Sequence, residues 1–204
     1  MSTRDSASVP TGNVYDKYAT KNPIERRLVS SFLTRLTSSL PAAAPATVLE
    51  IGVGEAQVSR RVVARYPDAT VVGLDLPDAT LVDAWDVLGG RGVFGDAAAL
   101  PFPDAAFDLV LAIEVLEHLE DPRVALGELA RVAKPGCTVV LTVPSEPLWR
   151  GLNLLRAKYV RQLGNTPGHI QHWSPKAFER LVGETFEVRS VSRPLPWTMV
   201  VAAR

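Results

Sequence analysis

Apolar residues recur along this chain with two different periods, which together predict a mixed α/β structure. Between residues 24 and 36 they recur every fourth position, as on the buried face of an amphipathic helix, at Ile24, Leu28, Phe32 and Leu36. The preceding Asn22-Pro23 offers a capping side chain and a proline suited to the first helical turn. A helix is therefore predicted from Pro23 to about Ser39.

From residue 47 onward, short apolar runs alternate with segments of helical period. Continuously apolar runs suit strands that are buried on both faces of a parallel sheet, with helices as the crossovers. The predicted strands are 47–51, 70–74, 92–95, 107–113 and 138–143, and the predicted helices are 57–66, 79–88 and 122–132.

The last third of the chain differs in charge and in pattern. Residues 147–178 contain no acidic residue but several cations and two histidines. Ser174-Pro175 predicts a helix that runs to about Val182. Two further strands, 186–191 and 197–203, are joined by Pro-Leu-Pro, which predicts an antiparallel pair added to one edge of the sheet.

Composition predicts one cytosolic domain of ordinary size. The chain has 204 residues, 47% of them hydrophobic and 22% charged, and its formal net charge is zero, which argues against a nucleic-acid binder. The single cysteine, Cys137, cannot form an intramolecular disulfide and suits a reducing compartment. Residues 1–10 are polar, unlike a secretory signal, and no apolar run approaches the roughly 20 residues of a membrane helix.

Glycines follow the first predicted strand in Glu50-Ile-Gly52-Val-Gly54-Glu-Ala56. Such glycines let the backbone turn tightly and approach a ligand, while the next helix offers free N–H groups. The simpler alternative is a turn that merely needs glycine. Gln57 occupies the position of the third glycine in a nicotinamide fingerprint, so a pyrophosphate site is disfavoured.

Two aspartates stand at the ends of the next strands. Asp75 lies about 20 residues after the glycine turn, where a carboxylate can accept hydrogen bonds from a ribose. Its alternative role is a helix cap. Asp96 can accept from the exocyclic amine of an adenine, or it can be an ordinary turn residue.

Glu114, Glu117 and His118 directly follow the apolar run 107–113. We predict a helix there, which would place the three side chains on one face at the carboxyl edge of the sheet. Two carboxylates and an imidazole crowded together are costly unless a cation or a catalytic step uses them. We therefore expect the functional centre at this place.

Taken in order, these motifs resemble those of class I S-adenosylmethionine-dependent methyltransferases, over about residues 47–144. The family implies an α/β, Rossmann-like, seven-stranded and mostly parallel sheet with an antiparallel last strand and helices on both faces. The motifs that carry the resemblance are Glu50-Ile-Gly52-Val-Gly54, Asp75, Gly95-Asp96-Ala97 before Leu100-Pro-Phe, Phe107-Asp-Leu-Val, Val115-Leu-Glu-His-Leu119 and Lys134-Pro-Gly136.

The resemblance also implies which residues bind S-adenosylmethionine. One position departs from the family pattern, because Ala56 stands where glycine is common, and we expect weaker or slightly shifted binding there. The implied contacts are Glu50, Gly52 and Gly54 at the methionine part, Asp75 and Leu76 at the ribose, Asp96 and Ala97 at the adenine, Ile113 beside them, and Tyr15 and Lys21 from an N-terminal segment that closes over the cofactor.

The Glu-x-x-Glu-His pattern is similar to the metal-binding helix of ubiquinone-biosynthesis O-methyltransferases and small-RNA 2′-O-methyltransferases. That likeness implies a divalent cation such as Mg²⁺, which would lower the pKa of an acceptor hydroxyl. Its implied ligands are Glu114, Glu117, His118 and a later histidine, His169 or His172. Without a metal, His118 or one of the later histidines would act as a general base beside Glu117.

We thus expect a flexible segment over residues 1–22 and one methyltransferase domain over 23–204, with a lid over about 147–173. The basic lid predicts a small-molecule acceptor that is anionic or rich in hydroxyl groups, methylated on oxygen. The alternatives are a non-catalytic nucleotide-binding module with a degenerate cofactor site, an RNA 2′-O-methyltransferase and a nicotinamide-dependent oxidoreductase. No membrane association is expected, and the oligomeric state stays open.

Overall fold

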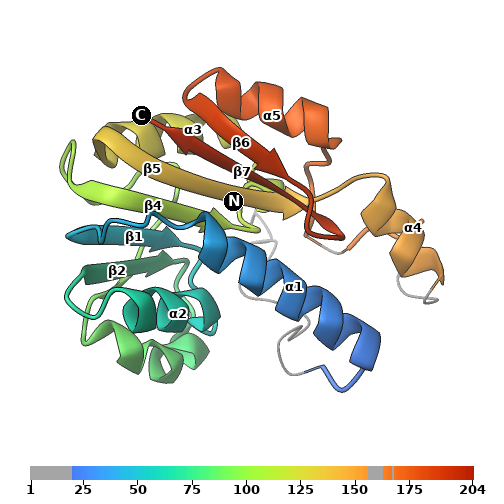
Figure 1. Cartoon of the computed structure of the whole chain (residues 1–204), viewed down its shortest axis with the longest axis horizontal. Helices are drawn as coiled ribbons and strands as arrows, with labels where there is room; N and C mark the ends of the chain where they lie inside the picture. The colour runs from blue at the N-terminus through green and yellow to red at the C-terminus, as the bar shows by residue number, and fades with distance from the viewer. Residues whose placement is uncertain (1–19, 156–162, 167) are drawn as a thin grey trace, which may run out of the picture.

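A computed structural model describes residues 20–155, 163–166 and 168–204, which are arranged around a central sheet (Figure 1). The sheet has seven strands in the order β3-β2-β1-β4-β5-β7-β6, and the pairs among β1 to β5 are parallel. The strands are β1 (Thr47–Ile51), β2 (Thr70–Asp75), β3 (Gly92–Phe94), β4 (Phe107–Ile113), β5 (Ala133–Pro144), β6 (Glu187–Ser192) and β7 (Trp197–Ala203). The predicted fold class is confirmed.

The two final strands form an antiparallel pair at one edge of the sheet, as predicted. β7 is inserted between β5 and β6 and runs antiparallel to both, so β6 forms the edge. The Pro194-Leu-Pro196 connection reverses the chain as predicted. Because β7 is central, it is apolar on both faces, whereas the shorter β6 is partly exposed.

Helices cover both faces of the sheet (Figure 1). On one face α3 and α5 pack through Leu126, Leu129, Phe178 and Val182, and on the other α1, α2 and η1 pack through Phe32, Val62 and Trp85. The helices are α1 (Pro23–Ser39), α2 (Gln57–Arg65), η1 (Ala79–Leu88), η2 (Leu116–His118), α3 (Pro122–Val132), α4 (Leu148–Leu155) and α5 (Pro175–Gly183), of which η1 and η2 are 3₁₀-helices.

Predicted capping residues begin two of these helices. The Asn22 side chain accepts a hydrogen bond from the Ile24 N–H (2.9 Å) at the start of α1. The Ser174 hydroxyl accepts from the Ala177 N–H (3.3 Å) at the start of α5. In both helices a proline follows the cap. Proline has no backbone N–H, and none is needed there because the first N–H groups of a helix have no helical acceptor.

The parallel strands bring their carboxyl ends to one edge of the sheet. The glycine loop, Asp75, Asp96 and the segment from Glu114 to His118 all follow strands that end there. Helix α4 stands beyond the tip of β5 at the same edge (Figure 1). Within the described ranges, no helix has the length and apolar character needed to cross a membrane.

Candidate active site

The loop after β1 turns sharply at Gly52. This residue has φ +70°, and its N–H donates to the Leu74 carbonyl of β2 (2.8 Å). A Cβ at this position would lie 2.3 Å from Cγ2 of Val115, which belongs to the segment after β4. Glycine is required here both for the left-handed backbone and for the close approach of two loops.

The peptide groups of Gly54 are held from two sides. Its N–H donates to Oδ2 of Asp75 (2.7 Å), and its carbonyl accepts from Nε1 of Trp85 (2.9 Å). The other carboxylate oxygen of Asp75 accepts from the Leu76 N–H (2.8 Å). Each oxygen keeps a second lone pair, which the predicted contact with a ribose requires. Burial raises the pKa of Asp75 against the lowering effect of these N–H donors.

Glu50 lies beneath the loop rather than on its open side. Its side chain is buried in β1, and it accepts a short hydrogen bond from the Ser59 hydroxyl of α2. Burial raises the pKa of Glu50 to about 8. This carboxyl group therefore joins β1 to α2, and its predicted contact with the methionine part of a cofactor stays a prediction.

Ala56 is the N-cap of α2 and adopts the left-handed conformation, with φ 56° and ψ 28°. For a residue other than glycine this conformation costs about 1–2 kcal/mol. The methyl group is fully buried against the α1 and α2 side of the core. The departure from the family pattern is thus accommodated by packing, because the backbone keeps the turn that glycine would make.

The other predicted cofactor contacts differ in exposure. Asp96 is exposed and accepts from the Ala98 N–H (2.8 Å), so in this structure it stabilises a turn. Leu76 and Lys21 are exposed, whereas Ala97 and Ile113 are buried. Tyr15 lies outside the described residues.

The predicted helix from Glu114 to His118 is wrong. Strand β4 ends at Ile113, Glu114 has φ 58°, and the helical turn η2 covers only Leu116–His118. The cause is tertiary, because the Glu114 N–H continues the sheet by donating to the Thr142 carbonyl of β5 (3.0 Å). Glu114 therefore does not share a helix face with the other two residues.

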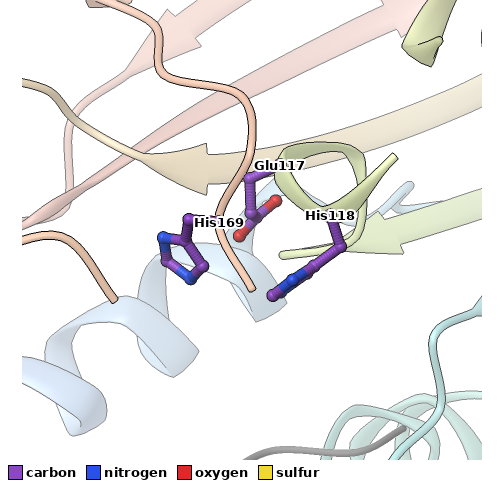
Figure 2. A group of neighbouring side chains, drawn as sticks. All are labelled: Glu117, His118 and His169. Carbon is purple, nitrogen blue, oxygen red and sulfur yellow. The ribbon is translucent and has the colours of Figure 1, made fainter. Parts of the chain in front are cut away.

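Glu117, His118 and His169 come together instead (Figure 2). One potential ligand atom from each lies within 4.8 Å of the others. Glu117 and His169 are buried, while His118 is exposed. The Glu117 carboxylate is directed between the two imidazole rings, which meet edge to face with their centroids 5.0 Å apart.

Hydrogen bonds from residues 168–171 hold this cluster in place. The N–H groups of Ile170 and Gln171 both donate to the Glu117 carbonyl, at 2.9 and 3.1 Å. Nδ1 of His118 lies 3.0 Å from the Gly168 carbonyl. Because a carbonyl oxygen only accepts, Nδ1 of His118 carries the hydrogen of this contact.

His172, the other predicted later histidine, does not join the cluster. Its Nε2 lies 2.6 Å from Oδ1 of Asn165, and the ring is exposed. Burial, and to a smaller extent the charge of Arg150, lower its pKa. The structure thus brings Glu117 and His118 together with His169, the other later histidine considered, and leaves Glu114 and His172 apart from them. A metal bound by this group stays a prediction.

Two tryptophans near the site were missed as site-forming residues. Trp85 holds the Gly54 carbonyl, and Trp149 of α4 stacks on His169 with the ring centroids 6.2 Å apart. Trp149 also donates from Nε1 to the Thr166 hydroxyl (2.9 Å). Sequence spacing could not predict these contacts, because His169 and Thr166 lie 17 or more residues after Trp149.

Comparison with known proteins agrees with this geometry. A family model described as a methyltransferase domain matches residues 49–141. Ajmaline N-methyltransferase of Rauvolfia serpentina is 29% identical over 147 residues, which are 65% of this chain and 48% of that protein. 27-O-demethylrifamycin SV methyltransferase of Amycolatopsis mediterranei is 34% identical over 133 residues, 62% of this chain and 47% of that protein.

Among solved structures, a SAM-dependent methyltransferase from Aquifex aeolicus has a TM-score of 0.68 at 19% identity, covering 92% of this chain and 98% of that one. The chain spans about half the length of the curated relatives it matches. The chain therefore carries a methyltransferase domain over residues 49–141, and its strand order and glycine loop are those of class I S-adenosylmethionine-dependent methyltransferases.

Replacing Asp75 by alanine is expected to weaken S-adenosylmethionine binding by roughly 10- to 100-fold, the usual loss for a hydrogen bond to a charged group. The Gly54 N–H would lose its acceptor, and the loop its link to β2. Isothermal titration calorimetry measures this, with Asp68→Ala in the exposed turn before β2 as control. Equal affinity in Asp75→Ala and wild type would contradict the assignment.

The stability of the protein should depend on the ionisation of Glu50. Its pKa is raised from 4.5 to about 8, so the folded state binds more protons than the unfolded state between these values. The free energy of unfolding is therefore expected to fall as pH rises through this window and to level off above it. Urea unfolding of Glu50→Gln, which has no proton to lose, should show a smaller slope.

Glu179→Gln, an exposed site on α5, serves as the matched control and should keep the wild-type slope. A Glu50→Gln curve parallel to that of the wild type would show that Glu50 is ionised in the folded protein at neutral pH.

Proposed function

We propose that this protein methylates a hydroxyl oxygen of a small-molecule acceptor, with Glu117, His118 and His169 facing that hydroxyl. The observation that carries the proposal is the buried Glu117 carboxylate between two imidazoles, at the same sheet edge as the glycine loop. The two loops are in contact, since Val115 fills the space beside Gly52. A methyl donor held by the first loop would thus have its acceptor beside the second.

The residues on the cofactor side suit S-adenosylmethionine. A carboxylate at the end of β2 matches a ribose diol, and the left-handed glycines at 52 and 54 leave the loop backbone open to a ligand. When bound, the cofactor would supply a methyl group: an acceptor oxygen would attack the methyl carbon in line, the methyl–sulfur bond would break, and the sulfur would leave as a neutral thioether. Alignment of the two reactants in a closed pocket can contribute roughly 7–11 kcal/mol.

The chain's own residues then handle the proton of the acceptor hydroxyl. Nδ1 of His118 is held by the Gly168 carbonyl, so we assign proton transfer to the other ring nitrogen, Nε2. Nε2 would accept the proton, and the Glu117 carboxylate would stabilise the resulting imidazolium. General-base catalysis of this kind typically contributes 10²–10⁴-fold. Trp149 keeps the His169 ring in place by stacking on it.

Several features support a small acceptor. The curated relatives named above act on ajmaline and on a rifamycin, one as an N-methyltransferase and the other at a 27-O position. The chain's net charge of zero disfavours a polynucleotide. Arg150 and Lys176 of the acid-free span lie in the described part of the chain, whereas Arg156, Lys158 and Arg161 lie outside it. Their charge favours an anionic or hydroxyl-rich acceptor.

Metal assistance is a second candidate mechanism for the same reaction. Two imidazoles and one carboxylate are the three protein ligands of many catalytic metal sites, which keep a position open for water or substrate. The spacing of Glu117, His118 and His169 fits this pattern. A divalent cation held there would lower the pKa of an acceptor hydroxyl.

Replacing His118 and His172 in turn tests the assignment. With labelled S-adenosylmethionine and a panel of hydroxylated small molecules, His118→Ala removes the proposed base and is expected to lower kcat by about 10²-fold or more. His172→Ala should stay within a few-fold of the wild type. Equal losses in both variants, or none in either, would contradict the proposal, and calorimetry confirms that cofactor affinity is retained.

Chelation separates the two mechanisms. If a metal is used, dialysis against EDTA should abolish turnover, and one divalent cation should restore it in the wild type but not in Glu117→Ala. Turnover that is indifferent to EDTA assigns the step to His118 as the base. In that case kcat should fall on the acidic side of the pH profile, where the imidazole base is protonated, and Glu117→Gln should displace that limb.

A further inference from the structure

An open groove lies between α1 and α2, and none of Glu117, His118 and His169 lines it. Its volume is about 630 Å³, within the range of small-molecule sites. Arg26 lines it from α1, and Arg61 and Arg65 line it from α2. Val29 and Leu33 add apolar surface. No acidic side chain lines the groove among the described residues.

The two helices concentrate positive charge in a chain whose formal net charge is zero. Glu25 is the one acidic residue within α1 and α2. Within the described parts of the chain, no ion pair engages the three groove arginines. The helices together hold six arginines, Arg26, Arg27, Arg35, Arg60, Arg61 and Arg65.

Contacts within the protein hold Arg61 and Arg65 in place and use only some of their N–H donors. Nη1 of Arg61 donates to the Gln57 carbonyl (2.6 Å). Arg65 donates from Nε to the Tyr66 hydroxyl (3.2 Å) and lies over that ring, 5.3 Å from its centroid. A guanidinium has five N–H donors, so each side chain keeps several for a ligand. Such pre-positioned guanidinium groups suit phosphate and other oxyanions.

We infer that this groove binds a small anion carrying more than one phosphate or similar oxyanion group. Three positive charges line one groove, Arg26 from α1 and Arg61 and Arg65 one turn apart on α2, which favours a ligand with more than one negative charge. The hydroxyls of Ser30 and Thr34, which also line the groove, add donors between the charges. The apolar surface of Val29 and Leu33 accommodates the uncharged body of such a ligand.

This inference does not rest on the proposed function. Gln57 at one end of the groove directly follows the cofactor loop, but the groove arginines do not take part in the contacts of Gly52, Gly54 or Asp75. Loss of anion binding and loss of methyl transfer can therefore be measured separately in the same variants.

Titration of the full chain with inorganic tripolyphosphate at fixed ionic strength tests the site. Wild-type protein should bind it, and Arg61→Gln and Arg26→Gln should each weaken binding about tenfold, as expected when a charge-assisted contact is lost. Arg35→Gln is the matched control, since it removes a charge from α1 outside the groove lining. The affinity for S-adenosylmethionine should be unchanged in all three variants.

Two results would overturn the inference. One is absence of binding at about 1 mM tripolyphosphate, which corresponds to a negligible affinity. The other is an equal loss in Arg35→Gln and Arg61→Gln, which would show attraction to the overall charge of the helices rather than to the groove. Circular dichroism of each variant verifies that the fold is retained.

Discussion

The hydrogen bond between the Gly54 N–H and the Asp75 carboxylate joins the ends of β1 and β2, and the cofactor side of the site depends on it. The Gly54 carbonyl is fixed separately by Trp85, so the peptide groups on both sides of Gly54 are oriented. Beneath them, the buried Glu50 joins β1 to α2 through Ser59. The loop is held at the Gly54 N–H and carbonyl, and the strand and helix on either side of it are joined by Glu50 and Ser59. Such pre-organisation lowers the entropic cost of ordering the loop when a ligand binds.

The acceptor side is built onto this loop by packing. The position that a Cβ of Gly52 would occupy is filled by Val115, two residues before Glu117. Residues 168–171 are in turn bound to η2, through the two N–H donors to the Glu117 carbonyl and through the His118 ring. The buried carboxylate and the two imidazoles are thus positioned largely by backbone hydrogen bonds, which explains how residues about 50 positions apart form one cluster.

Sequence patterns predicted the parts that local physics decides. Apolar runs located β1 and β4 to the residue, and caps located the starts of α1 and α5. The helix at Glu114 was wrong because a hydrogen bond to Thr142 and a left-handed backbone decide that segment. Sequence spacing alone could not decide whether His169 or His172 joins Glu117 and His118. That choice depends on contacts of residues 168–171 with η2, which lies about 50 residues earlier in the chain. The sequence also did not predict that the Glu50 side chain is buried, because the glycine-loop motif specifies residue types and not their solvent exposure.

The central claim is that one sheet edge holds both the methyl donor and the groups that handle the acceptor proton. A crystal structure with S-adenosylhomocysteine tests it most directly. The account predicts the ribose hydroxyls on Asp75, the homocysteine part along the loop of Gly52 and Gly54, and the sulfur facing Glu117, His118 and His169. A nucleoside bound elsewhere, or a sulfur turned away from these three side chains, would contradict it.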